Sequence, residues 1–130
     1  MLSRRAALLA AAAASSVFVT PAFSTETKPF TQNDFAAAQK AGKPIFVAIH
    51  ATWCPTCKAQ KPILDKLTAD PKFRDLKIFR VDFDSMKPAV REFGANMQST
   101  LIVFKGASEK GRSVGDTAEN SIATLLDKSL

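Results

Sequence analysis

Two cysteines, Cys54 and Cys57, are the residues of this chain best suited to covalent chemistry. They are the only cysteines among 130 residues, and they form a Cys-Pro-Thr-Cys motif shortly after an apolar run. The start of a helix favours the reactive thiolate, because unpaired backbone N–H groups and the helix macrodipole attract an anion. We therefore expect Cys54 to lie at a helix N-terminus and attack disulfides, and Cys57, one turn later, to resolve the mixed disulfide.

The residues beside the cysteines suit this chemistry. Pro55 can begin a helix without losing a hydrogen bond, because the first N–H groups of a helix have no intrahelical acceptor. Trp53 would provide a flat apolar surface beside the reactive sulfur. The sequence thus predicts a thiol pair with an adjacent surface for a partner.

Three other interpretations of the cysteine pair remain open. A structural disulfide across four residues would remove little chain entropy and would be a poor crosslink. A structural zinc site usually takes four Cys or His ligands, whereas this chain offers two cysteines and His50. Cys54, Cys57 and His50 would hold a soft metal such as Cu(I) or zinc if a second chain contributed ligands, and this binding module is the alternative function.

Residues 1–24 have the pattern of a secretory signal peptide. Arg4 and Arg5 precede an Ala-rich apolar run, and the small residues Ala22 and Ser24 allow cleavage after either position. The apolar run is short for a membrane anchor, which needs about 20 residues. Ser3-Arg4-Arg5 also suggests the twin-arginine route. We therefore expect export to the periplasm, where disulfides persist, and a single domain at 25–130.

The remaining chain alternates between helical and strand patterns. In chain order, we expect a helix opened by Thr31 and Asp34 and ended at Gly42, a strand at 44–49, a helix at 54–69 kinked at Pro62, a strand at 76–83, a helix at 85–93, strands at 100–104 and 110–114, and a last helix capped by Asp116 and Glu119. The run 44–49 is continuously apolar, as in a strand buried on both faces. This order predicts an α/β fold with a central mixed sheet and helices on both faces.

The net charge of +6 does not predict a nucleic-acid-binding protein. Basic residues between positions 72 and 84 are dispersed among acidic ones, as on a solvated surface. Nucleic-acid binding would call for a clustered basic patch with aromatic platforms. We therefore expect no nucleic acid among the partners.

The sequence resembles the thioredoxin family over roughly residues 30–130. The matching features are Trp53-Cys54-Pro55-Thr56-Cys57-Lys58, Pro62 five residues after the second cysteine, Asp84 after a strand, and Gly94 followed by the segment 100–106. The resemblance implies a thioredoxin fold, thiol–disulfide exchange through Cys54 and Cys57, and no bound organic cofactor. It also implies protein thiols or disulfides as substrates, contacted by Trp53, Gln98, Ser99 and Thr100.

Two positions depart from the family pattern. The family usually has a cis-proline just before the strand at 100–104, where this chain has Ser99. A cis peptide before a residue other than proline costs about 3 kcal/mol, so we expect a trans bond. The family also has a buried acid six residues before the first cysteine, where it helps take the proton of the resolving thiol. Here that residue is Ala48, so proton transfer needs water or another group.

His50 and Arg80 are expected to modulate the thiols. His50 lies four residues before Cys54 and has three interpretations: a proton acceptor or thiolate partner, a metal ligand, or a packed polar residue at a strand end. Arg80 stands where the family often has a basic residue, and it would either act on a thiol or lie at the surface.

These observations predict a periplasmic thiol–disulfide oxidoreductase. The short length resembles the minimal family fold and lacks the helical insertion of periplasmic oxidases, so we expect reduction of protein disulfides rather than oxidation. Electrons for a reductase outside the cytoplasm must come from the membrane, which implies a membrane-bound electron donor, or an acceptor if the direction is reversed.

Overall fold

The fold was analysed in a computed structural model, which describes residues 12–19 and 25–130. Most of the expected signal peptide, at 1–11 and 20–24, lies outside the described residues. Residues 12–19 contain no helix or strand. Among the described residues, no helix is both long and apolar enough to cross a membrane.

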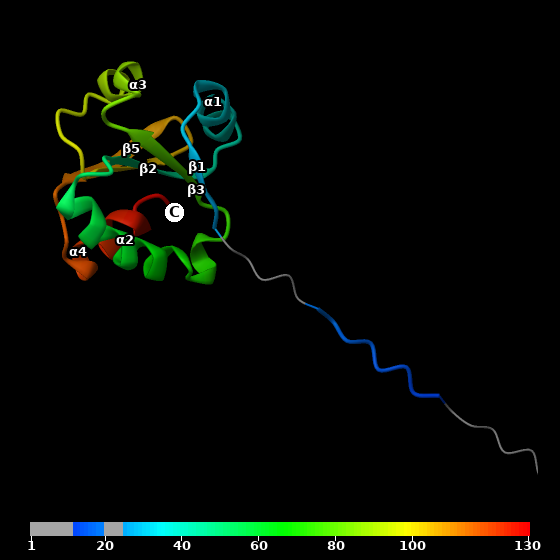
Figure 1. The fold of residues 1–130 in the computed structure, drawn as a ribbon. Helices are drawn as coiled ribbons and strands as arrows, with labels where there is room; N and C mark the ends of the chain where they lie inside the picture. The colour runs from blue at the N-terminus through cyan, green and yellow to red at the C-terminus, as the bar shows by residue number, and fades with distance from the viewer. Residues whose placement is uncertain (1–11, 20–24) are drawn as a thin grey trace, which may run out of the picture.

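Five strands form one mixed sheet in the order β1-β3-β2-β4-β5 (Figure 1). The strands are β1 (Thr27–Pro29), β2 (Pro44–His50), β3 (Lys77–Asp82), β4 (Thr100–Lys105) and β5 (Ser108–Val114). The continuous apolar run predicted a central strand buried on both faces, and β2 lies at the centre of the sheet. It runs parallel to β3 and antiparallel to β4. The expected α/β fold with a mixed sheet is confirmed.

Helices cover both faces of this sheet (Figure 1). They are α1 (Gln32–Lys40), α2 (Pro55–Thr68), the short 3₁₀ helix η1 (Pro71–Phe73), α3 (Lys87–Glu92) and α4 (Glu119–Asp127). Helices α1 and α3 lie on one face, and α2 and α4 lie on the other. The active-site motif therefore belongs to the α2/α4 face.

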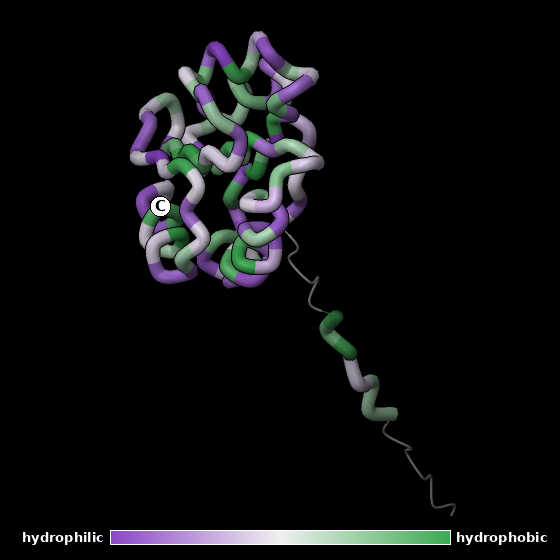
Figure 2. The backbone as a smooth tube through the Cα atoms, turned by 60° about the vertical axis from the view of Figure 1, so that its left-hand side comes forward, coloured by the Kyte–Doolittle hydropathy of each residue, from purple (hydrophilic) through white to green (hydrophobic). Residues whose placement is uncertain are grey.

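Alternation along β2 divides the core into two layers. Ile45, Val47 and Ile49 pack with the α1/α3 face, whereas Phe46 and Ala48 pack with the α2/α4 face. Within the folded domain, hydrophobic stretches of the backbone accordingly cross the middle in Figure 2, between more hydrophilic outer turns. His50 continues the second set, so it points toward the same face as Ala48.

The structure corrects three details of the predicted elements. Strand β1 was not predicted, because its three residues are exposed and show no apolar pattern; parallel pairing with β3 alone defines it. Helix α3 begins two residues later than expected, because Asp82 caps the intervening turn by accepting from Asp84 N and Ser85 N. The last helix begins after Ala118 rather than at a capping box, because the Asp116 carboxylate instead accepts from Ala118 N in the preceding turn.

The opening of α1 agrees with its sequence signal. Thr31 is the N-cap, and its hydroxyl accepts a hydrogen bond from Asp34 N at 3.2 Å. The cap satisfies one of the N–H groups that a helix start leaves unpaired. The predicted boundary before Gln32 is therefore confirmed.

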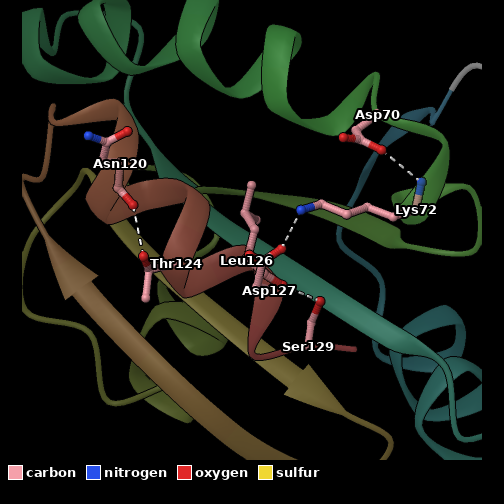
Figure 3. A network of polar contacts seen from close by, with 7 residues as sticks. All are labelled: Asp70, Lys72, Asn120, Thr124, Leu126, Asp127 and Ser129. Atoms are coloured by element: carbon pink, nitrogen blue, oxygen red, sulfur yellow. Dashed lines mark hydrogen bonds and ion pairs between the residues drawn. The ribbon is translucent and has the colours of Figure 1, made fainter.

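Polar contacts tie α4 to the segment that follows α2 (Figure 3). Lys72 Nζ lies 2.8 Å from Asp127 Oδ1, and Lys72 N donates to Asp70 Oδ1 at 3.0 Å. Ser129 Oγ closes the helix end by donating to Leu126 O at 2.7 Å. Exposed ion pairs contribute at most about 1 kcal/mol, so α4 is held mainly by its buried apolar face. That face consists of Ile122, Leu125 and Leu126.

Candidate active site

The end of β2 and the start of α2 place the two cysteines. Cys54 is the N-cap of α2 in an extended conformation, and its Sγ accepts a hydrogen bond from Cys57 N at 3.1 Å. Pro55 occupies the first helical position, where the missing N–H costs nothing. The predicted position of Cys54 at a helix N-terminus is confirmed.

Both sulfurs are present as free thiols and are buried. Cys54 and Cys57 pack with Ala51, and Phe83 covers this small cluster. Burial raises the pKa of the Cys57 thiol above its usual value, and the hydrogen bond with Cys54 acts in the same direction. Cys57 therefore keeps its proton at neutral pH, and a base must remove it before Cys57 can act as a nucleophile.

Ser99 holds an unusual backbone conformation opposite the cysteines. The peptide bond before it is trans, as expected, and its φ of 62° lies in the left-handed region. Its N–H donates to Ile49 O at 2.8 Å, and its carbonyl accepts from Gly115 N at 3.0 Å. These bonds tie the loop that precedes β4 to the end of β2 and to the residue after β5, without a cis-proline.

Gln60 is a site residue that the sequence analysis missed. Its side chain is buried, and Nε2 donates to Asp116 O at 2.9 Å and to Ser99 O at 3.3 Å. One amide thus joins α2 to both segments that border the cysteines. Its position three residues after Cys57, on the inward side of α2, was the available signal.

The predicted substrate-contacting residues differ in exposure. Trp53 is 55% exposed and donates from Nε1 to Asp84 Oδ2 at 2.7 Å, which fixes the indole beside Cys54. Gln98 is half-buried, whereas Ser99 and Thr100 are buried. Thr100 Oγ1 donates to Met97 O at 2.7 Å. The structure brings these residues to one end of the sheet, and their contacts with a substrate stay predictions.

His50 and Arg80 lie behind Cys57 rather than beside Cys54. All three residues line one cavity between β2, β3 and α2. Burial and the positive charge of Arg80 lower the pKa of His50, and the carboxylate of Asp82 opposes them. His50 is therefore neutral at pH 7, with a ring nitrogen free of a proton.

The metal-binding alternative gains no support. Across residues 12–19 and 25–130, no group of three or more His, Cys, Asp and Glu side chains is arranged to hold a metal ion.

Comparison with known proteins agrees with the fold and with the site. The family profile described as Thioredoxin matches residues 26–128. Thioredoxin from Chlamydia muridarum is 33% identical over 98 residues, which cover 75% of this chain and 93% of that protein. The solved structure of Trxlp from Edwardsiella tarda has a TM-score of 0.76 and 39% identity, and covers 78% of this chain and 98% of its own. Thioredoxin NaTrxh from Nicotiana alata has a TM-score of 0.69 and 26% identity, covering 79% of this chain and 91% of its own.

A five-stranded mixed sheet with a Cys-x-x-Cys pair at the start of its second helix defines a class of thiol–disulfide oxidoreductases. The chain belongs to the thioredoxin family. Its activity is thiol–disulfide exchange with protein thiols and disulfides.

Proposed function

We propose that this protein is exported to the periplasm and reduces disulfides there. In each cycle Cys54 attacks a substrate disulfide and Cys57 resolves the mixed disulfide. The substrate leaves as a dithiol and the protein as the Cys54–Cys57 disulfide. A membrane-bound electron donor then returns the pair to the dithiol form.

The main support for reduction of disulfides, as opposed to their oxidation, is the minimal fold. The sheet and its helices account for residues 25–130 without an inserted helical domain, and the matched relatives are named thioredoxins.

A small apolar surface around the cysteines supports protein substrates. Trp53, Met97 and Val114 are large apolar side chains that are each at least half exposed. Val114 pairs with Thr100 across β4 and β5, and Met97 lies two residues before Ser99, so both border the Ser99 loop. Such a surface fits an extended apolar segment next to a substrate disulfide.

The reduction potential of the Cys54–Cys57 pair tests the direction of electron flow. We expect a reduction potential of about −270 mV, as in thioredoxin, measured by equilibration with glutathione buffers. A reduction potential of about −120 mV, as in the strongest periplasmic oxidants, would contradict reduction.

The mature N-terminus tests the proposed export. Mass spectrometry of the protein from its native host should show a chain that begins at Thr25 or Phe23. A soluble cytoplasmic protein that retains Met1 would contradict export, and with it the need for a membrane donor.

A further inference from the structure

A cavity behind Cys57 separates its sulfur from polar groups of the sheet. Its volume is about 100 Å³, and its walls include Ala48, His50, Cys57, Gln60, Lys61 and Arg80. A cavity of this size has room for water, since one water needs about 10–15 Å³, and His50, Gln60, Lys61 and Arg80 offer it polar partners. Water in this cavity would contact both Cys57 and the polar groups of its wall.

The geometry of β2 decides which residue can receive a proton across this cavity. Ala48 and His50 are two residues apart on one strand, so their side chains point toward the same face. Ala48 provides no acceptor, and its small side chain leaves the space open. His50 is the one histidine of the chain, and it lines the same cavity as Cys57.

The protonation states of the two groups match a transfer from Cys57 to His50. Cys57 holds its proton because burial raises the pKa of the thiol. His50 is a neutral imidazole because burial and Arg80 lower its pKa. A neutral acceptor and a protonated donor on one cavity form a donor–acceptor pair for general base catalysis.

We propose that His50 accepts the proton of Cys57 through water in this cavity and so takes the place of an acid at position 48. This inference rests on the proposed exchange reaction. The Cys57 S–H bond breaks as its proton moves through water to the imidazole. The Cys57 thiolate attacks Cys54 Sγ, and the Cys54–substrate S–S bond breaks. Its electron pair leaves on the substrate sulfur, which takes a proton from solvent, and His50 returns its own proton to water.

Charged groups around the cavity set the pH range of this transfer. They are Arg80 and Asp82 on β3, and Lys58, Lys61 and Asp65 on α2. Arg80 disfavours and Asp82 favours the protonated imidazole. Proton transfer to His50 thus accelerates resolution most at pH values between the lowered pKa of His50 and the raised pKa of Cys57. Below this range the imidazole is already charged, and above it the thiol ionises unaided.

An aromatic disulfide whose released thiolate is coloured separates the two steps in one stopped-flow trace. The first coloured thiolate reports the attack by Cys54, and the second reports the resolution by Cys57. In the full-length chain with His50→Asn, we expect an unchanged first phase. The second phase should slow on the order of 100-fold near pH 7, the lower end of the contribution from a positioned base. This difference should shrink as the pH rises through the pKa of Cys57.

Two further sets of variants distinguish proton transfer from a structural effect. Adding Ala48→Asp to the His50→Asn chain should restore the second phase, because a carboxylate then faces the same cavity. Arg80→Gln should move the acidic limb of the second phase to higher pH, and Asp82→Asn should move it to lower pH. The single histidine gives one imidazole NMR signal, which should titrate with the same shifts.

The outcomes separate this inference from the function on which it rests. If wild type releases no coloured thiolate, thiol exchange itself fails and the inference fails with it. If exchange is normal but His50→Asn leaves the second phase unchanged, only the inference is wrong. Slowing by a constant factor at every pH, without rescue by Ala48→Asp, would likewise overturn it in favour of packing.

Discussion

The two faces of the sheet are built differently. The α1/α3 face is filled by the rings of Phe30, Phe35, Phe79, Phe93 and Phe104, whose paired centroids lie 5.2 to 6.3 Å apart. All of these pairs meet edge-to-face or tilted, an arrangement that adds about 0.5–1.5 kcal/mol per pair beyond burial. The α2/α4 face is mainly aliphatic and contains the cavity with His50 and Cys57.

This difference separates stability from chemistry. The aromatic face carries no group that the exchange reaction uses, so it can be packed without space for water. The other face keeps a cavity, a buried amide and two thiols close together, and each of these costs packing energy. The aromatic layer therefore supports β2 from behind while the opposite side of the same strand presents the reactive groups.

The largest effect on activity is expected from substitution of the two cysteines, which lie on the α2/α4 face. Cys54→Ser should abolish exchange, because the attacking sulfur is lost. Cys57→Ser should instead accumulate mixed disulfides through Cys54, since only the resolving thiol is missing. Insulin reduction assays and non-reducing gels measure the two outcomes. Limiting alkylation of wild type should modify Cys54 first, and preferential labelling of Cys57 would reverse these roles.

Truncation of a core side chain on each face should show where stability resides. Phe35 contacts four other rings, so Phe35→Ala should lower the free energy of unfolding by about 3–5 kcal/mol. The matched change Leu64→Ala, at a half-buried cavity wall, should cost no more than about 2 kcal/mol. Urea denaturation measures both losses. Equal losses would show that the two faces contribute alike.

A smaller effect tests the loop that borders the reactive face. Ser99→Pro removes the N–H that donates to Ile49 O, and proline cannot adopt a φ of 62°. The unsatisfied buried carbonyl alone should cost about 1–3 kcal/mol. The control Ser99→Gly keeps the N–H and accepts positive φ, so its stability should stay at or above wild type. Thermal denaturation compares them; a stable Ser99→Pro chain would mean that the loop converts readily to another conformation.

Much of the fold could be predicted from local sequence patterns. The apolar run at 44–49 predicted a central strand, and the Cys-Pro-Thr-Cys motif predicted a helix beginning at Cys54, both as observed. The short strand β1 could not be predicted, because its residues are exposed and only pairing with β3 orders them. Likewise, the carboxylate of Asp116 could either cap the last helix or accept a hydrogen bond in the turn before it, and the sequence did not distinguish these two roles.

The sequence by itself determined the reactive pair and its place at a helix start. These follow from residue type and short-range spacing, which local backbone geometry converts directly into position. Only the tertiary structure decided that Gln60 binds the carbonyls of Ser99 and Asp116, and that His50 shares a cavity with Cys57. Those relations join segments far apart in the chain, and they exist only because the sheet and α2 pack at a particular distance.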